Sequence, residues 1–177
     1  MRFVKLFKPD YYISSYRNLD VRRLKENHIR LLLCDIDNTL AGPHERDADV
    51  QVAQFLRRVQ QAGIETMICS NSRPSRVRRF VKDLPVDQAY GFSFKPLVYQ
   101  LKRAMHHAHT DAAHTAIMGD QIFTDILGGN RIGLYTILTN PVSTSDKGVT
   151  MLNRLLEKFV FRYLEKKYSF RKGDYDD

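Results

Sequence analysis

Four short polar segments carry residue types that together could transfer a phosphoryl group. They are Asp35–Leu40 (DIDNTL), Ser70–Ser72 (SNS), Lys95-Pro96 and Gly119–Asp125 (GDQIFTD). An Asp carboxylate can attack phosphorus to give an aspartyl-phosphate, and a second acid two residues on can protonate the leaving oxygen and then activate water. Carboxylates from two segments can hold a hard cation such as Mg²⁺. A Lys and a hydroxyl group can bind the oxygens of the transferred group.

Each segment also has a simpler interpretation when it is taken alone. Asp and Asn are common in turns, where their side chains accept hydrogen bonds from backbone amides. Ser, Thr and Asp are common caps at helix starts, and a Lys before a helix is usually solvated. The spacing favours a shared site, because 35, 25 and 25 residues separate Asp35, Ser70, Lys95 and Asp120, about one strand–helix unit each.

The polar segments follow apolar runs that are typical of buried strands. We expect strands over 29–36, 64–69, 88–90, 115–118 and 133–139. Between them, apolar residues recur at helical spacing. This pattern predicts a helix capped by Asp47 or Asp49 with Gly63 after its end, a helix that stops before Pro85, a helix that starts at Pro96 and buries Leu97, and a short helix over 123–130.

Strands that alternate with helices through short connections predict an α/β fold, a Rossmann-like parallel sheet with helices on both faces. In such sheets the functional site lies outside the carboxyl ends of the strands, where the four polar segments fall. We expect a single domain over 1–177. Its catalytic core would span 29–140, between an N-terminal basic and aromatic flank (1–28) and a C-terminal basic amphipathic helix (148–172).

The order of the motifs resembles that of the haloacid dehalogenase-like (HAD) phosphohydrolases. The resemblance implies a Mg²⁺-dependent phosphatase in which Asp35 is the nucleophile and Asp37 is the general acid and base. It also implies that Asp35, the backbone carbonyl of Asp37, and Asp120 hold the metal. Asp125 would support this site by orienting metal-bound water or the motif lysine.

The same resemblance assigns the residues that bind the phosphate. Ser70 and Asn71 correspond to the second motif, and Thr39 would brace the first loop beside the phosphate. Lys95 would offset the negative charge of both phosphate and nucleophile. Ser72 departs from the family pattern, where a second Asn is expected. The departure affects none of the proposed catalytic roles, but it could alter the loop that receives the substrate.

A narrower resemblance covers most of the chain. FKPD near the start, with DIDNTL, KP and GDQIFTDILGGNRIG, is similar to the YqeG subfamily of capless (class III) HAD phosphatases, which is related to the mitochondrial phosphatidylglycerophosphate phosphatase. The gaps of 35 and 25 residues between motifs leave no room for a folded cap. An open site favours a bulky or surface-held substrate, or else oligomerisation supplies the lid.

The subfamily implies that phosphatidylglycerophosphate is dephosphorylated to phosphatidylglycerol. Two alternatives remain. One is a HAD phosphatase for a soluble sugar phosphate, nucleotide or phosphoprotein. The other is an RNA- or ribosome-associated protein with a secondary phosphatase site, in keeping with a pI of about 9.6. The chain has no RNA-binding motif, so we rank an anionic lipid headgroup above nucleic acid as partner.

The net charge of +8 resides in the flanks. Residues 1–30 hold eight Lys and Arg against three Asp and Glu, 31–150 hold thirteen against twelve, and 151–172 hold seven against two, while the last five residues hold three Asp and no Lys or Arg. The C-terminal helix has an apolar face beside a row of basic residues, which are Arg154, Lys158, Arg162 and Lys166. Such a helix lies on an anionic membrane or packs on the sheet with a solvated basic edge. The N-terminal flank is an interfacial anchor or covers a sheet edge.

A further basic cluster follows the second motif, at Arg73, Arg76, Arg78, Arg79 and Lys82. It either receives another phosphate of the substrate or is a solvated helix face.

Composition sets the remaining expectations. The chain has no apolar run of about 18 residues and no secretory signal at its start. Cys34 and Cys69 cannot form a disulfide framework. We therefore expect a cytoplasmic protein, with peripheral membrane contact, in which both cysteines are buried apolar residues. The histidines of the 106–114 cluster lack a spacing typical of zinc ligands, and the first three, His106, His107 and His109, are expected at the surface.

Overall fold

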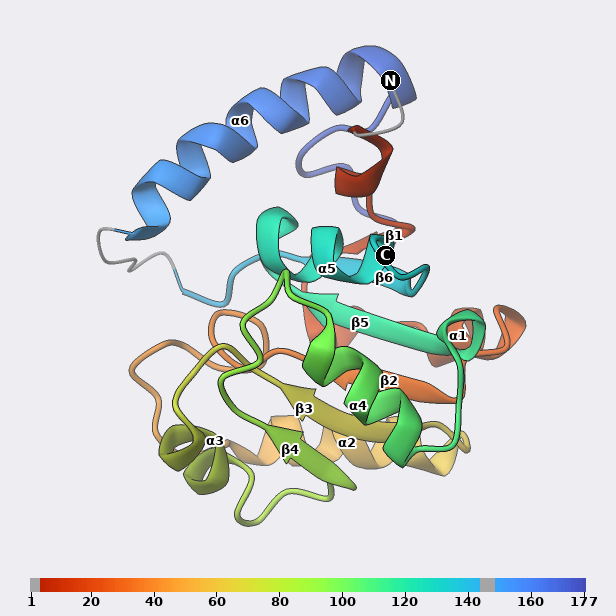
Figure 1. The fold of residues 1–177 in the computed structure, drawn as a ribbon, viewed down its shortest axis with the longest axis vertical. Helices are drawn as coiled ribbons and strands as arrows, with labels where there is room; N and C mark the ends of the chain where they lie inside the picture. Colours follow the sequence, from red (N-terminus) through yellow and green to blue (C-terminus); the bar gives the residue numbers. More distant parts are fainter. Residues whose placement is uncertain (1–3, 144–148) are drawn as a thin grey trace.

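The computed structural model describes residues 4–143 and 149–177, with side chains over 5–143 and 156–177. Its centre is a six-stranded sheet in the order β1-β6-β5-β2-β3-β4 (Figure 1). Every neighbouring pair of strands is parallel. The strands are β1 (Tyr11–Ile13), β2 (Leu31–Cys34), β3 (Glu65–Cys69), β4 (Gln88–Tyr90), β5 (Thr115–Gly119) and β6 (Tyr135–Thr139). This confirms the expected parallel α/β sheet.

Helices cover both faces of the sheet, as predicted. Side chains alternate along a strand, so Leu32 and Cys34 of β2 face one layer while Leu31 and Leu33 face the other. The first layer contains α1 (Val21–Glu26), α2 (Val50–Gln61) and α3 (Pro74–Phe80), and the second contains α4 (Tyr99–His107). Because both faces are buried, β2 reads as a continuous apolar run.

Most helix boundaries follow the expected signals. The Asp49 side chain accepts a hydrogen bond from the Val52 amide at the start of α2, and Gly63 beyond its end has a φ of +82°. The expectation for Pro96 and Leu97 is wrong, because α4 begins only at Tyr99 and Leu97 is 59% exposed. The intervening segment forms part of a loop that positions Lys95.

The N-terminal flank contributes a strand. Tyr11, Tyr12 and Ile13 form β1 and are buried, and β1 pairs with β6 at the edge of the sheet. On its other side the C-terminal tail returns to β1. The Tyr12 amide donates to Asp176 Oδ2 over 2.8 Å, and the Ser14 amide donates to Asp177 Oδ1 over 2.9 Å. The sequence predicts that the N-terminal flank either anchors the protein at a membrane interface or covers a sheet edge. In the structure it lies at the edge of the sheet.

The C-terminal helix α6 (Val149–Tyr168) lies beyond the β1–β6 edge (Figure 1). Phe161 and Leu164 are buried, and Phe161 packs with Phe7 and Ile122 of the short helical segments η1 (Val4–Phe7) and η4 (Ile122–Ile126). The predicted wide apolar face is split, because Leu156, Phe159 and Tyr163 of that face are 39–60% exposed. The side chains of Leu152, Arg154 and Leu155, which belong to the predicted apolar face and basic row, are not among those that the structure describes.

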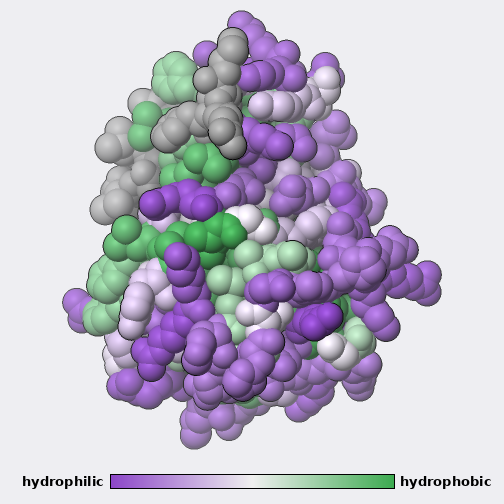
Figure 2. Space-filling view, turned by 45° about the vertical axis from the view of Figure 1, so that its right-hand side comes forward, coloured by the Kyte–Doolittle hydropathy of each residue, from purple (hydrophilic) through white to green (hydrophobic). Residues whose placement is uncertain are grey.

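The remaining short elements are η2 (Tyr16–Asn18), η3 (Ala112–His114) and α5 (Leu127–Asn130). The face in Figure 2 is mainly hydrophilic, with hydrophobic side chains gathered in a limited area. Among the described residues, no helix combines the length and apolar character needed to span a bilayer. Cys34 and Cys69 are buried and unpaired, as predicted, and His106, His107 and His109 are exposed.

Candidate active site

Asp35 directly follows β2, at the point where the strand order reverses. The chain proceeds from β2 to β3 and β4 on one side, then returns to β5 on the other. The Asp35 amide donates to the Met118 carbonyl of β5 over 3.0 Å, so the backbone stays in register while the side chain turns to the sheet edge. Ligands bind at such reversal points in open α/β sheets.

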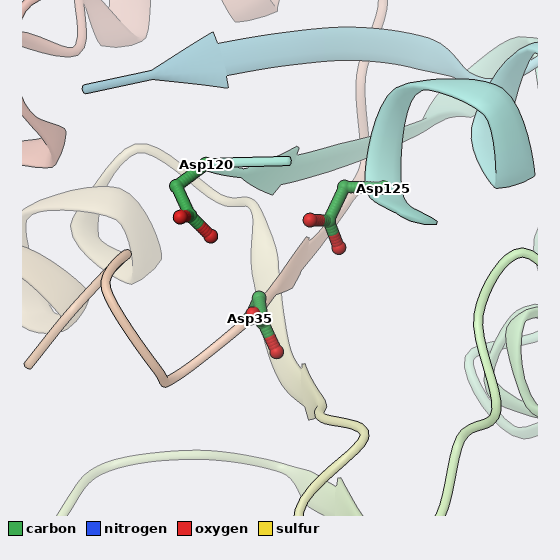
Figure 3. Close-up of side chains that lie close together, drawn as sticks. All are labelled: Asp35, Asp120 and Asp125. Atoms are coloured by element: carbon green, nitrogen blue, oxygen red, sulfur yellow. The ribbon is translucent and has the colours of Figure 1, made fainter. Parts of the chain in front are cut away.

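Asp120 and Asp125 come from the segment after β5. Asp120 follows the strand, and Asp125 lies in η4, a π-helical turn, with its side chain fully buried. Carboxylate oxygens of Asp35, Asp120 and Asp125 lie within 4.8 Å of one another (Figure 3). A Cβ atom at Gly119 would lie 2.1 Å from Cγ of Asp125, so this close approach requires glycine.

Lys95 is the buried cation of the site. Its Nζ lies 2.9 Å from Asp35 Oδ1 and 2.6 Å from Asp125 Oδ1, and its side chain is 1% exposed. Asn71 holds the backbone of the lysine, since its Oδ1 accepts from the Lys95 amide over 2.7 Å and its Nδ2 donates to the Lys95 carbonyl over 3.1 Å. Asn71 thus links the end of β3 to the lysine loop.

The protonation equilibria reflect this crowding. Burial raises the pKa of Asp35 to about 6, against the opposing effect of Lys95. Burial also raises the pKa of Asp120 well above its usual range, and the Asp125 and Asp35 charges add to this shift. For Lys95, burial lowers the pKa, but the two neighbouring carboxylates together raise it above its ordinary value. The site therefore carries an excess of negative charge that a cation would relieve.

Asp37 faces the more open side of the site, with its side chain 27% exposed. Arg76 of α3 binds Asp37 Oδ1 through Nη2 at 2.5 Å and Nε at 3.0 Å. The Ser72 hydroxyl donates to Asp37 Oδ2. Ser72, the position that departs from the family pattern, therefore contacts the proposed general acid and base. The contact depends on how α3 meets the first loop, which residue spacing does not reveal.

Ser70 and Thr39 complete the predicted set. Ser70 is buried at the end of β3, and its Oγ accepts from the Ser72 amide over 3.2 Å. Thr39 is fully buried, and its Oγ1 donates to Asp120 Oδ1 over 3.5 Å. Asn38 has a left-handed backbone with a φ of +63°, which Asn tolerates, and its amide donates to the Ala41 carbonyl to close the first loop.

The donor set suits a metal. Asp35, Asp120 and Asp125 supply only carboxylate oxygens, the ligands that hard divalent cations prefer. The raised pKa values of Asp35 and Asp120 are the expected sign of carboxylates that lack a sufficient counter-charge. The cluster therefore fits a cation site.

Known proteins share this chain's sequence and fold. Residues 1–84 match the family described as mitochondrial PGP phosphatase, and residues 94–160 match the HAD-hydrolase-like family. The chain is 31% identical over 163 residues to the "Probable phosphatase YqeG" of Bacillus subtilis (strain 168), covering 92% of this chain and 94% of that protein. It is 24% identical over 169 residues to "Phosphatidylglycerophosphate phosphatase 1, chloroplastic/mitochondrial" of Arabidopsis thaliana, covering 89% of this chain and 48% of that protein.

A solved structure with a similar fold is the cobalt-bound deoxy-D-mannose-octulosonate 8-phosphate phosphatase (YrbI) of Haemophilus influenzae. The TM-score is 0.53 at 15% identity, over 84% of this chain and 96% of that one.

The fold and site define a HAD-like phosphatase without a cap domain. Between Asp35 and Lys95, all of which the structure describes, the chain forms α2, β3, α3 and β4 and no inserted domain. Within that class, the chain belongs to the YqeG family of phosphatases.

Proposed function

We propose that this phosphatase works through an aspartyl-phosphate on Asp35 and requires Mg²⁺. The observation that carries the proposal is the meeting of Asp35, Asp120, Asp125 and Lys95 at the reversal point of the sheet. Asp35, Asp120 and the Asp37 carbonyl would hold Mg²⁺, with Asp125 supporting the site. The ion would supply positive charge against the phosphate oxygens and orient them.

The reaction then follows in two displacements. A carboxylate oxygen of Asp35 attacks phosphorus, the bond from phosphorus to the leaving oxygen breaks, and Asp37 gives its proton to that oxygen. Water next attacks the aspartyl-phosphate while Asp37 takes its proton, which releases inorganic phosphate and restores Asp35. Lys95, Ser70 and Thr39 would stabilise the charge of the transferred group and its loop.

We further propose phosphatidylglycerophosphate as the substrate. Support comes from the family match over residues 1–84 and from the named activity of the Arabidopsis relative, although the chain spans about half the length of that relative. An open site also suits a substrate that stays in a membrane. Phospholipid synthesis would then be the process that this enzyme serves.

The loop that carries Lys95 supports contact with a lipid surface. Phe92, Phe94, Leu97 and Tyr99 are 43%, 60%, 59% and 71% exposed, although Lys95 between them is buried. The rings of Phe92 and Phe94 stack with centroids 5.6 Å apart. Both residues have left-handed backbones, with φ of +46° and +50°, which is unfavourable for a bulky side chain. Strained, exposed aromatic residues beside a site favour a binding role over a packing role.

Helix α6 would add an electrostatic contribution to this contact. Its exposed apolar residues Leu156, Phe159 and Tyr163 lie at i, i+3 and i+7, and so on one stripe. Lys158, Arg162 and Lys166 are also exposed along the helix. Basic residues near an anionic surface each contribute roughly 1 kcal/mol of attraction.

The test is phosphate release by purified protein from phosphatidylglycerophosphate in vesicles and from a panel of soluble phosphates. Wild type should act on the vesicles, lose activity with EDTA and regain it with Mg²⁺. Asp35→Asn should abolish turnover and the hydroxylamine-sensitive phosphoenzyme, while Asp83→Asn, at an exposed Asp outside the site, is the matched control.

Equal activity of Asp35→Asn and wild type would overturn the catalytic assignment. Turnover of a soluble phosphate with none on vesicles would overturn the lipid substrate and leave the chemistry in place.

A further inference from the structure

A cavity of about 540 Å³ adjoins the open side of the active site. Its lining residues are Pro43, His44, Arg46, Ser75, Arg76 and Arg79. Three of these six residues are arginines, one is a histidine and none is acidic. The cavity is therefore suited to an anion, and arginine is the side chain that binds phosphate oxygens through two parallel hydrogen bonds.

Arg76 joins this cavity to the catalytic residues. Its guanidinium binds Asp37 on one side and donates through Nη1 to the Glu45 carbonyl over 2.7 Å. In the proposed reaction Asp37 must touch the oxygen that leaves, so the leaving group lies against Asp37. Arg76 binds Asp37 and also lines the cavity, so the cavity lies next to Asp37. A large leaving group held against Asp37 would extend into it.

The other two arginines have free capacity for an anion. Arg46 is exposed and makes no hydrogen bond or ion pair with any residue that the structure describes. Arg79 pairs with Asp47, with Nη2 at 2.8 Å and Nε at 2.9 Å from the carboxylate oxygens, but the two side chains are 52% and 67% exposed. Exposed pairs of this kind contribute little stability, so this guanidinium can turn to a phosphate at small cost.

We propose that this cavity binds a second anionic group, a phosphodiester, carried by the leaving group of the substrate. The proposal rests on the proposed function, because the role of Asp37 sets the direction in which the leaving group lies. It narrows the substrate class to phosphomonoesters whose alcohol bears a phosphodiester a short distance away. Such a group exists in the headgroup of phosphatidylglycerophosphate and equally in its deacylated, water-soluble form.

The backbone places the loop that carries Lys95, with its exposed Phe92 and Phe94, next to the same cavity. The Phe92 amide donates to the Ser72 carbonyl over 2.8 Å, and a Cβ on Gly91 would lie 2.8 Å from the Pro74 backbone. Pro74 starts the helix that carries Ser75, Arg76 and Arg79. A phosphodiester in the cavity would thus have its acyl side within reach of the exposed rings.

The experiment compares two soluble phosphomonoesters, deacylated phosphatidylglycerophosphate and glycerol 3-phosphate, which lacks the phosphodiester. Wild type should favour the first in kcat/KM. In Arg46→Gln the ratio of the two kcat/KM values should fall roughly tenfold, as expected for the loss of one charge-assisted contact, and further in Arg46→Gln/Arg79→Gln. Arg57→Gln removes an exposed arginine of α2 and should leave the ratio unchanged.

A ratio that stays constant in both cavity variants would overturn the proposal. Phosphatidylglycerophosphate in vesicles is a parallel arm, since an Arg46 effect limited to vesicles would mean that the residue meets the membrane and not the phosphodiester. Calorimetric titration with glycerophosphoglycerol, the deacylated product, tests binding in the cavity separately from the proposed phosphatase function. If wild type turns over neither soluble substrate nor phosphatidylglycerophosphate in vesicles, the proposed function fails. Binding that weakens about tenfold in Arg46→Gln would still support the cavity, and no binding would refute it.

Discussion

Replacing the two stacked phenylalanines of the lysine loop should detach the protein from lipid surfaces. The proposed change is Phe92→Asn/Phe94→Asn. Asn tolerates the left-handed backbone that both positions have, so the double variant should fold at least as readily as wild type. The change removes exposed aromatic surface and leaves the buried side chain of Lys95 in place.

The size of the effect follows from the exposed fractions. Full burial of a phenylalanine contributes roughly 2 kcal/mol relative to exposure. Phe92 and Phe94 have 43% and 60% of their surface still to bury, so each should contribute about 1 kcal/mol on insertion. Together they should change the vesicle partition coefficient about thirtyfold, since a factor of ten corresponds to 1.4 kcal/mol.

The assay is co-sedimentation with sucrose-loaded vesicles of equal parts phosphatidylcholine and phosphatidylglycerol, with thermal unfolding as the check on folding. Val50→Asn is the matched control, because Val50 is 66% exposed at the start of α2 and outside the loop. Partitioning of the double variant within threefold of wild type would refute the role of the loop. A comparable loss in Val50→Asn would show that general surface hydrophobicity is responsible.

Three further changes test the site itself. Lys95→Met should leave Asp35 and Asp125 buried without their cation and lower the free energy of unfolding by about 3–5 kcal/mol at pH 7, as measured by urea titration. The loss should shrink toward pH 4, where protonation removes the charge of Asp35, and a pH-independent loss would contradict this account. Metal-free wild type should lose stability as pH rises from about 4 through the Asp35 pKa of about 6, because the folded state holds that proton more tightly than the unfolded state. Mg²⁺ should therefore stabilise the protein more at pH 7 than at pH 5, and Asp120→Asn should remove most of that difference. Gly119→Ala should displace the Asp125 carboxylate, cost about 1–3 kcal/mol and reduce Mg²⁺-dependent activity at least tenfold, and a fully active variant would refute the close approach.

The sequence predicts where the carboxylates of the candidate site lie, because their positions depend on a general rule. Asp35 and Asp120 each follow a buried apolar strand, and parallel strands bring their carboxyl ends to one edge. Lys95 is predicted for the same reason. The predicted helix start at Pro96 is wrong, because tertiary contacts override the local helix propensity there. Asn71 holds the Lys95 backbone from another strand, and the chain becomes helical only after that constraint ends.

Other features depend on contacts that no local pattern encodes. The β1 strand is three residues long and lies in a segment whose basic and aromatic composition is more prominent than its strand propensity. The pairing of Arg76 and Ser72 with Asp37 depends on where α3 meets the first loop. The division of α6 into a packed stripe and an exposed stripe depends on its rotation against η1 and η4.

The placement of β1 affects the order in which the molecule can be assembled. One side of β1 pairs with β6, and the other accepts Asp176, which is 164 residues from Tyr12 in the chain. Both contacts join segments that lie far apart in the chain, so β1 is complete only once β6 and Asp176 have been made. Long-range closures of this kind are slow, and an unpaired strand edge can associate with other chains while it waits. The β1 edge is therefore expected to be open to association with other chains until both contacts have formed.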